Sequence, residues 1–199
     1  YPGHQFDDNR SNLMIYLNCG DFQFCLSNDY QIPTQQTVSG ISTADFDRNG
    51  LIDIVFSTWE IDFNNLQDVL LNAEKTSKKE YAAASVYLQT APGNFINKTE
   101  SLGLLYNSKY QTAFSILATD LHKDQWTDIM IGRDFDLPDL VFMNQEGKSF
   151  QLVQPFQSTS FYTMGMDAAD IDNNGWIDIA STDMRPASDY RQKTVRYEK

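Results

Sequence analysis

The feature that most constrains this chain is an acid-rich segment that occurs three times, each time followed by an apolar, β-branched stretch. The copies begin at Asp45, Asp120 and Asp170. They read Asp-Phe-Asp-Arg-Asn-Gly-Leu-Ile-Asp, Asp-Leu-His-Lys-Asp-Gln-Trp-Thr-Asp and Asp-Ile-Asp-Asn-Asn-Gly-Trp-Ile-Asp. Self-similarity of this kind is the signature of a repeat architecture, in which each repeat is one supersecondary unit. The chain is therefore expected to build one unit several times over.

A second element recurs between the acidic segments. Apolar runs at 14–18, 86–89 and 140–144 are each followed by a Gly-bearing turn and then by Phe22, Phe95 or Phe150. An apolar run, a turn and a returning aromatic strand predict a β-hairpin. Hairpins alternating with acidic loops predict an all-β chain with repeat units at about 13–57, 86–132 and 140–181.

The spacing of the acidic segments is uneven. Asp45 and Asp120 are 75 residues apart, whereas Asp120 and Asp170 are 50 apart. The excess matches residues 60–84, in which Leu66, Val69, Leu70 and Ala73 recur at helical spacing. We expect an insertion at 60–84 with a short helix near 62–80.

Sheets of this size need a neighbour, because one sheet cannot bury both of its faces alone. Radial stacking of four-stranded sheets makes a β-propeller, which usually has four to eight blades. A chain of 199 residues holds three to four units of this length. We therefore expect residues 1–199 to form a single, partial β-propeller of about three to four blades. It would belong to a longer propeller or close a ring with another chain.

The acidic segments have the oxygen ligands that calcium prefers. Ca²⁺ takes six to eight oxygen atoms at flexible geometry, and a Gly is needed where the backbone turns sharply around the ion. Positions 1, 3, 5 and 9, with the carbonyl of position 7, are the expected ligands. In the first loop they are Asp45, Asp47, Asn49, Asp53 and Leu51, and in the third they are Asp170, Asp172, Asn174, Asp178 and Trp176.

The middle segment keeps Asp120, Asp124 and Asp128 but has His122 at position 3 and Gln125 in place of Gly. A side chain disfavours the positive φ of a tight turn, and imidazole is a softer ligand than Ca²⁺ prefers. We expect a degenerate third site here. An EF-hand is the rival for such spacing, but neither complete loop has the Glu at position 12 that an EF-hand requires. The remaining alternative is an Asp/Asn-rich turn without metal.

Charge and composition limit the partners. The 27 acidic and 15 basic side chains give a net charge of −12, which disfavours nucleic acid and favours cations. No apolar run is long enough for membrane insertion. Cys19 and Cys25 are spaced to form a disulfide across a short hairpin, although a buried pair of free thiols fits equally well.

These loops resemble the FG-GAP or VCBS repeats of integrin α-chain propellers. The segment 160–179, with the following Thr182-Asp-Met-Arg-Pro186 and Asp189-Tyr-Arg-Gln-Lys193, resembles the propeller of the UnbV and cartilage-acidic-protein (ASPIC) family. The Gly-Asp-Gly-Thr-Phe hairpin turns typical of that family are eroded here. The resemblance implies a secreted, periplasmic or cell-surface protein with calcium-stabilised blades, further repeats in a longer chain, and no catalytic residues.

An enzyme would need convergent acids, bases or a nucleophile, and no such motif occurs in the sequence. We expect an interaction, adhesion or assembly scaffold that binds protein partners. The alternative is a glycan-binding, lectin-like propeller or a non-catalytic part of a polysaccharide-active enzyme. Aromatic residues such as Trp59, Trp126, Trp176 and Tyr162 would stack on sugars in that case, but most are expected to pack between blades.

Overall fold

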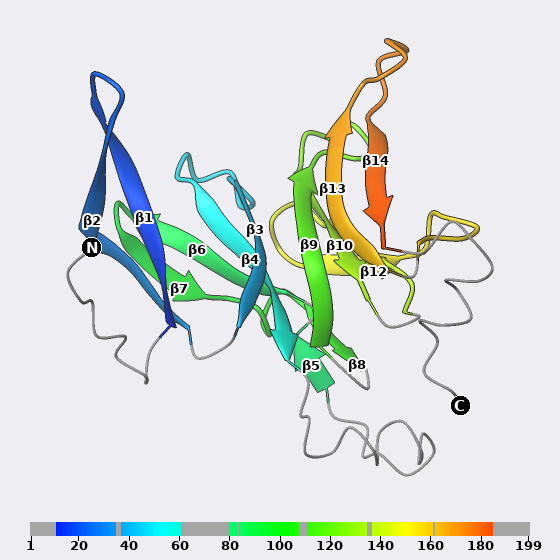
Figure 1. Ribbon diagram of the computed structural model, residues 1–199, viewed down its shortest axis with the longest axis horizontal. Coiled ribbons are helices and arrows are strands. Elements are labelled where there is room, and N and C mark those ends of the chain that lie inside the picture. The colour runs from blue at the N-terminus through cyan, green and yellow to red at the C-terminus, as the bar shows by residue number, and fades with distance from the viewer. Residues whose placement is uncertain are drawn as a thin grey trace.

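The structure, a computed structural model, describes residues 11–34, 37–60, 80–82, 84–107, 111–134, 137–160 and 162–184. All regular elements within these ranges are strands, so the all-β prediction is confirmed (Figure 1). The expected helix near 62–80 falls almost wholly on residues 61–79, which lie outside the described ranges.

Two four-stranded antiparallel units form the centre of the molecule. The first unit consists of β3 (Val38–Ala44), β4 (Asp53–Glu60), β6 (Ser85–Ala91) and β7 (Asn94–Asn97). The second unit consists of β9 (Gln111–Thr119), β10 (Asp128–Arg133), β11 (Leu140–Asn144) and β12 (Phe150–Val153). In each unit the strands pair in chain order.

The two units are joined at one end of β4. Trp59 pairs with Thr112 and Glu60 pairs with Gln111, which makes the two units parts of one curled, eight-stranded sheet. Three two-stranded sheets complete the described fold. They are the N-terminal hairpin β1 (Ser11–Gly20) and β2 (Gln23–Thr34), the C-terminal hairpin β13 (Thr163–Ala169) and β14 (Asp178–Asp183), and the pair β5 (Glu80–Ala82) and β8 (Leu105–Asn107).

Strand β4 shows how the pattern of the sequence produces the core. Successive side chains of a strand point to opposite faces, so a strand with a run of apolar residues can be buried on both sides. Val55 packs in the cluster between the two units, with Phe46, Val86 and Ile129. Ile54 and Phe56 face the other way and pack with Ile32 and its neighbours Leu13 and Ile15 from the N-terminal hairpin.

The order of stacking is therefore N-terminal hairpin, first unit, second unit and C-terminal hairpin, whose strand β13 contacts β9. The two hairpins lie at opposite sides of the molecule (Figure 1). Each hydrogen-bonded unit begins with the strand before an acidic loop, whereas the predicted repeat units 13–57, 86–132 and 140–181 begin with a hairpin.

Candidate metal-binding loops

The three acidic loops occupy equivalent places in the fold. The first loop (residues 45–53) joins β3 to β4, the middle loop (120–128) joins β9 to β10, and the third loop (170–178) joins β13 to β14. All three lie at the upper side of the view in Figure 1. Strands flank every loop, which excludes the helix–loop–helix arrangement of an EF-hand.

The three expected carboxylate ligands lie close together in both complete loops. Asp45, Asp47 and Asp53 each offer a carboxylate oxygen, and these oxygens lie within 4.8 Å of one another. The same limit holds for Asp170, Asp172 and Asp178. Two oxygens on opposite sides of a Ca²⁺ ion would be about 5 Å apart, because each lies about 2.3–2.6 Å from the ion. The carboxylates of both loops are therefore close enough to share one cation.

Asn at position 5 and the residue at position 7 form a local turn in both complete loops. Leu51 N donates to Asn49 Oδ1 at 2.7 Å, and Trp176 N donates to Asn174 Oδ1 at 2.8 Å. Asp and Asn side chains commonly support turns in this way. The turn alternative and the metal alternative are therefore compatible, because these bonds leave the carboxylates free to converge.

The Asp at position 9 is an expected metal ligand, and in the first two loops it also accepts hydrogen bonds that hold the loop in place. Asp53 is fully buried, and its Oδ2 accepts from Phe46 N at 2.8 Å while its Oδ1 accepts from Gln89 N at 2.8 Å. Asp128 repeats both bonds, to Leu121 N at 2.9 Å and to Asn144 N at 2.8 Å. Each of these carboxylates thus ties its loop to the third strand of its own unit.

Burial has an electrostatic consequence for Asp53. Burial raises the pKa of its carboxyl to about 6, against the opposing effect of the two N–H donors, and the charges of Asp47 and Asp45 raise it further. A cation at the loop would act in the opposite direction, since it favours the ionised carboxylate.

One carboxylate oxygen of the third loop lacks a partner. Asp170 Oδ2 accepts from Gly175 N at 2.8 Å, but Asp170 Oδ1 is shielded from solvent and receives no hydrogen bond from any described residue. The equivalent atom of the first loop, Asp45 Oδ1, accepts from Asn49 N at 3.1 Å. A shielded carboxylate oxygen without a donor is unfavourable unless a cation or another ligand compensates it, so the third loop fits a bound cation.

The middle loop has a different centre. His122 Nδ1 lies 2.9 Å from Asp128 Oδ2, and His122 Nε2 lies 2.9 Å from Asp124 Oδ2. Burial alone would lower the pKa of His122, but the hydrogen bond to Asp128 and the charges of Asp128, Asp124 and Asp120 outweigh it and raise the pKa. The imidazole therefore lies between carboxylates and, when protonated, offsets part of their negative charge.

The expectation about Gln125 needs a correction. A side chain was expected to disfavour the tight turn, yet Gln125 has φ 73°, close to φ 85° at Gly50 and φ 89° at Gly175. The middle loop therefore keeps the backbone conformation of the complete loops. A non-Gly residue held at positive φ is strained by about 1 kcal/mol or more.

Neighbouring loops also contact one another. The guanidinium carbon of Arg48 lies 4.4 Å from the ring centroid of Trp126, and Arg48 Nη2 donates to Gln125 O at 2.6 Å. In the same way, Lys123 Nζ lies 4.2 Å from the ring centroid of Trp176. The cation at position 4 of one loop thus reaches the Trp at position 7 of the next.

The interpretation of the sequence missed two residues that organise the loops. Asn144 ends β11 and Gln89 lies two residues before the end of β6. Their side-chain amides donate to Thr127 O at 3.0 Å and Ile52 O at 2.6 Å. Asn144 Nδ2 also donates to Phe46 O at 2.9 Å and so links the second unit to the first loop. A signal was available, because Asn18, Gln89 and Asn144 each precede a Phe by six residues.

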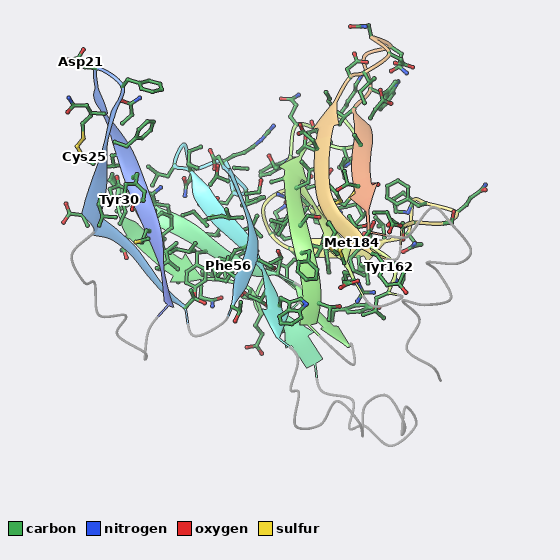
Figure 2. All side chains as sticks on the ribbon, viewed as in Figure 1. Asp21, Cys25, Tyr30, Phe56, Tyr162 and Met184 are labelled. Carbon is green, nitrogen blue, oxygen red and sulfur yellow. A yellow bond between two sulfur atoms is a disulfide. The ribbon has the colours of Figure 1, made fainter. Side chains whose placement is uncertain are left out.

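The two cysteines are bonded to each other, which resolves the open alternative: Cys19 and Cys25 form a disulfide near the tip of the N-terminal hairpin (Figure 2).

The packing expected for most of the aromatic residues does not hold for every one of them. Trp176 is 55% exposed, in contrast to the packing predicted for most of them.

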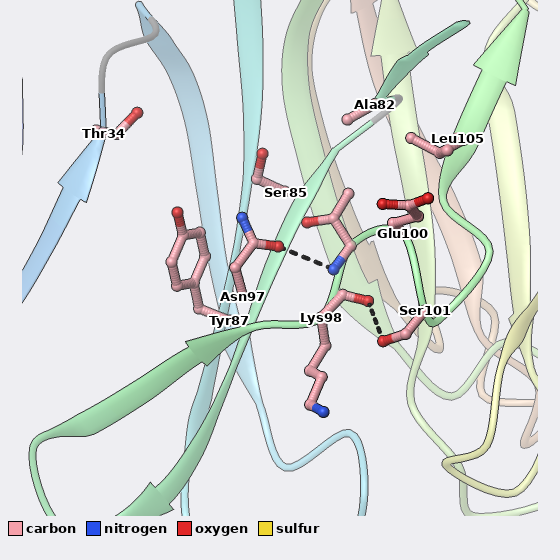
Figure 3. Close-up of a pocket in the computed structure, with 10 residues that line it drawn as sticks. Thr34, Ala82, Ser85, Tyr87, Asn97, Lys98, Glu100, Ser101 and Leu105 are labelled. Carbon is pink, nitrogen blue, oxygen red and sulfur yellow. Dashed lines mark hydrogen bonds between the residues drawn. The ribbon is translucent and has the colours of Figure 1, made fainter.

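The structure also contains an open, largely polar cavity of about 1000 Å³ beside the end of β7 (Figure 3). Asn97 Oδ1 accepts from Thr99 N at 3.0 Å, and Ser101 Oγ donates to Lys98 O at 3.1 Å. These bonds are local turn contacts.

Within the described residues, no helix is long and apolar enough to cross a membrane. No protein-family model and no curated protein matches the chain. The resemblance to FG-GAP, VCBS and UnbV/ASPIC propellers therefore stays a prediction.

Proposed function

We propose that this chain is a calcium-stabilised, non-enzymatic β-propeller module that acts as an interaction or assembly scaffold outside the cytoplasm. Two Ca²⁺ ions would be held by the complete loops. The ligands would be Asp45, Asp47, Asn49, Asp53 and the Leu51 carbonyl in one, and Asp170, Asp172, Asn174, Asp178 and the Trp176 carbonyl in the other.

The observation that carries the proposal is the convergence of three carboxylates within 4.8 Å in each complete loop. Three negative charges so close together repel one another, and a divalent cation would remove that repulsion. Asp170 Oδ1, which is shielded from solvent and receives no hydrogen bond from the described residues, supports the same conclusion. The ions would hold the loops in shape and would not themselves perform chemistry.

Two further observations support the scaffold part of the proposal. Stacked four-stranded antiparallel units are the building blocks of a propeller, and the chain has two of them with a hairpin on either side. The Cys19–Cys25 disulfide is typical of an oxidising compartment, which supports an extracellular, cell-surface or periplasmic location.

A calcium titration tests the proposal. We expect calcium to raise the melting temperature relative to a chelator, because a ligand that binds only the folded state stabilises it. The double variant Asp45→Ala, Asp170→Ala should lose this shift. Asp120→Ala is the matched control, since it removes position 1 of the middle loop and should leave the calcium-induced shift intact. An unchanged melting temperature in the wild-type protein would refute the metal sites.

Carbohydrate binding is a second candidate, favoured by the exposure of Trp176. Aromatic faces stack on sugar rings, although Lys123 covers part of this ring. Saturable glycan binding that disappears in Trp176→Ala but persists in Trp126→Ala would establish this function in place of a protein-binding scaffold.

A further inference from the structure

The two terminal hairpins correspond to the two halves of one unit. In the complete units, the first and second strands are joined by an acidic loop, and the third and fourth strands form a hairpin. The C-terminal hairpin β13–β14 has the acidic loop and matches the first half. The N-terminal hairpin β1–β2 has no acidic loop and matches the second half.

Residue pairing supports this match at a single register. An amide residue at or near the end of the third strand pairs with a Phe of the fourth strand in both complete units, as Gln89 with Phe95 and Asn144 with Phe150. In the N-terminal hairpin Asn18 pairs with Phe24. The side-chain oxygen of each amide residue also accepts from a Gly of its turn, Gly93, Gly147 or Gly20, at 2.9, 2.8 and 2.9 Å.

Among the described residues, the C-terminal hairpin has an acidic loop without a third strand, and the N-terminal hairpin has a third and a fourth strand without an acidic loop. Asp178 Oδ2 accepts from Ile171 N, but within the described ranges no third strand pairs with β14 to supply a donor to Oδ1 as Gln89 and Asn144 do for Asp53 and Asp128. Asn18 has no acidic loop of its own unit among the described residues. The side chain of Phe24 is 60% exposed, whereas its equivalent Phe150 is buried against Phe46.

We infer that the N-terminal hairpin of one copy of this chain docks on the C-terminal hairpin of a second copy and completes a four-stranded unit between them. The complete units define the contacts. Ile54 pairs with Tyr87 and Ile129 pairs with Phe142, so Ile179 would pair with Tyr16 of the docked hairpin. Asn18 N would donate to Asp178 Oδ1, as Gln89 N and Asn144 N donate to Asp53 and Asp128.

Contacts to the preceding unit follow in the same way. Phe150 packs on Phe46, which is position 2 of the first loop, and Asn144 Nδ2 donates to Phe46 O. Position 2 of the middle loop is Leu121. Phe24 of the docked hairpin would therefore pack on Leu121, and Asn18 Nδ2 would donate to Leu121 O.

A second copy is the occupant that fits the stacking already present. The N-terminal hairpin packs face to face on the first unit, and the second unit packs on the C-terminal hairpin. A docked copy thus continues the same stack. The two hairpins of one copy lie at opposite sides of the molecule and do not pair with each other (Figure 2). Two copies, each with two complete units and two halves, would close a ring of six units, within the size range of propellers.

The test is the oligomeric state of the 199-residue chain, measured by sedimentation and light scattering over a range of concentrations, in calcium and in chelator. We expect two-copy particles. Phe24→Asp should raise the dissociation constant about tenfold or more, as for the loss of a central aromatic contact. Phe22→Ser is the matched control, because Phe22 is 92% exposed at the hairpin tip and is not among the docked contacts above. The replacement is uncharged because the Phe22 ring lies edge-on to that of Phe24, with 6.2 Å between the centroids. It should associate like the wild type.

A mixing experiment separates this interface from general hydrophobic association. Phe24→Asp weakens the hairpin side and Leu121→Asp weakens the loop side, so at a concentration near the wild-type dissociation constant each variant alone should be mostly a single copy. A mixture of the two retains one intact interface and should form a two-copy particle that stops there. A wild-type chain that stays a single copy at all concentrations would overturn the inference. An equal effect of Phe22→Ser, or a mixture that does not associate, would overturn it too. Because association is also measured in chelator, its failure is distinguishable from failure of the calcium sites.

Discussion

The first and the middle acidic loops share one backbone conformation but have different centres. Position 4 has φ 58° at Arg48 and φ 62° at Lys123, and the carboxylate at position 9 accepts the same two hydrogen bonds in both loops. The group of ligand atoms within 4.8 Å of one another consists of three carboxylates in the first loop but of Asp120, His122 and Asp124 in the middle loop, where His122 bridges Asp124 and Asp128. Local hydrogen bonds and the carboxylate at position 9 therefore set the loop conformation. Whether a metal ion or the imidazole of His122 lies at the centre does not change that conformation.

The largest expected effect concerns position 9. Asp53→Ala in chelator should lower the free energy of unfolding by about 3 kcal/mol, because two buried backbone N–H groups lose their acceptor. Asp178→Ala is the matched control, since Asp178 accepts only one bond, from the exposed Ile171 N, among the described residues. Urea denaturation measures both variants. Equal losses would show that the bond to the third strand is not what stabilises the loop.

The substitution His122→Asp should turn the middle loop into a calcium site. In chelator this variant should be less stable, because a fourth carboxylate replaces the imidazole between Asp120, Asp124 and Asp128. With calcium at about 100 times its dissociation constant, the new site should add about 2.7 kcal/mol. Titration calorimetry should show three calcium ions per chain where the wild-type protein binds two. His122→Asn removes the imidazole without adding charge and should leave two, and a count of two in His122→Asp would contradict the interpretation.

Exchanging the residues at position 6 tests the backbone strain. Gln125→Gly should stabilise the protein by about 0.5 kcal/mol, because relief of the strained φ exceeds the entropy that Gly adds to the unfolded chain. Gly50→Gln should destabilise it by about 1 kcal/mol, although a Cβ at Gly50 meets no atom within 4 Å. Thermal melting measures both changes. Gln125→Ala keeps the strain, so an equal gain in that variant would mean that side-chain contacts are responsible.

The smallest effect is the pH dependence of the middle loop. The pKa of His122 is raised in the folded state above its usual value of 6.5. Its contribution is therefore fully present below pH 6.5 and is lost as the pH rises through the higher folded-state pKa. Because the side chain is partly exposed, the contribution should be below about 1 kcal/mol. The melting temperatures of wild type and His122→Gln, compared in chelator, should converge as the pH rises, and a constant difference would refute the charge balance.

Much of the fold was accessible from local patterns. The strands after each loop follow from β-branched, apolar runs, and the hairpins follow from Gly-bearing turns before Phe95 and Phe150. The three aspartates of each complete loop lie close together, as expected for positions 1, 3 and 9. The bonds of position 9 were not accessible, because Asp53 meets Gln89 36 residues away and Asp128 meets Asn144 16 residues away. His122 was interpreted as a lost ligand, since one residue name cannot show that both of its ring nitrogens meet carboxylates.

By itself, the sequence determined the repeating elements of this protein, because turn residues, strand alternation and ligand spacing act over fewer than ten residues. The tertiary structure decided which of these elements contact, bury and pair with one another. It buried Asp53 and Asp128 under the third strands, linked the loops through Arg48 and Trp126, and left the N-terminal and C-terminal hairpins as separate halves of a unit. The physical reason is that burial, the pKa of a carboxyl and the pairing of a strand edge depend on residues that are distant in the chain and meet only when the sheets stack.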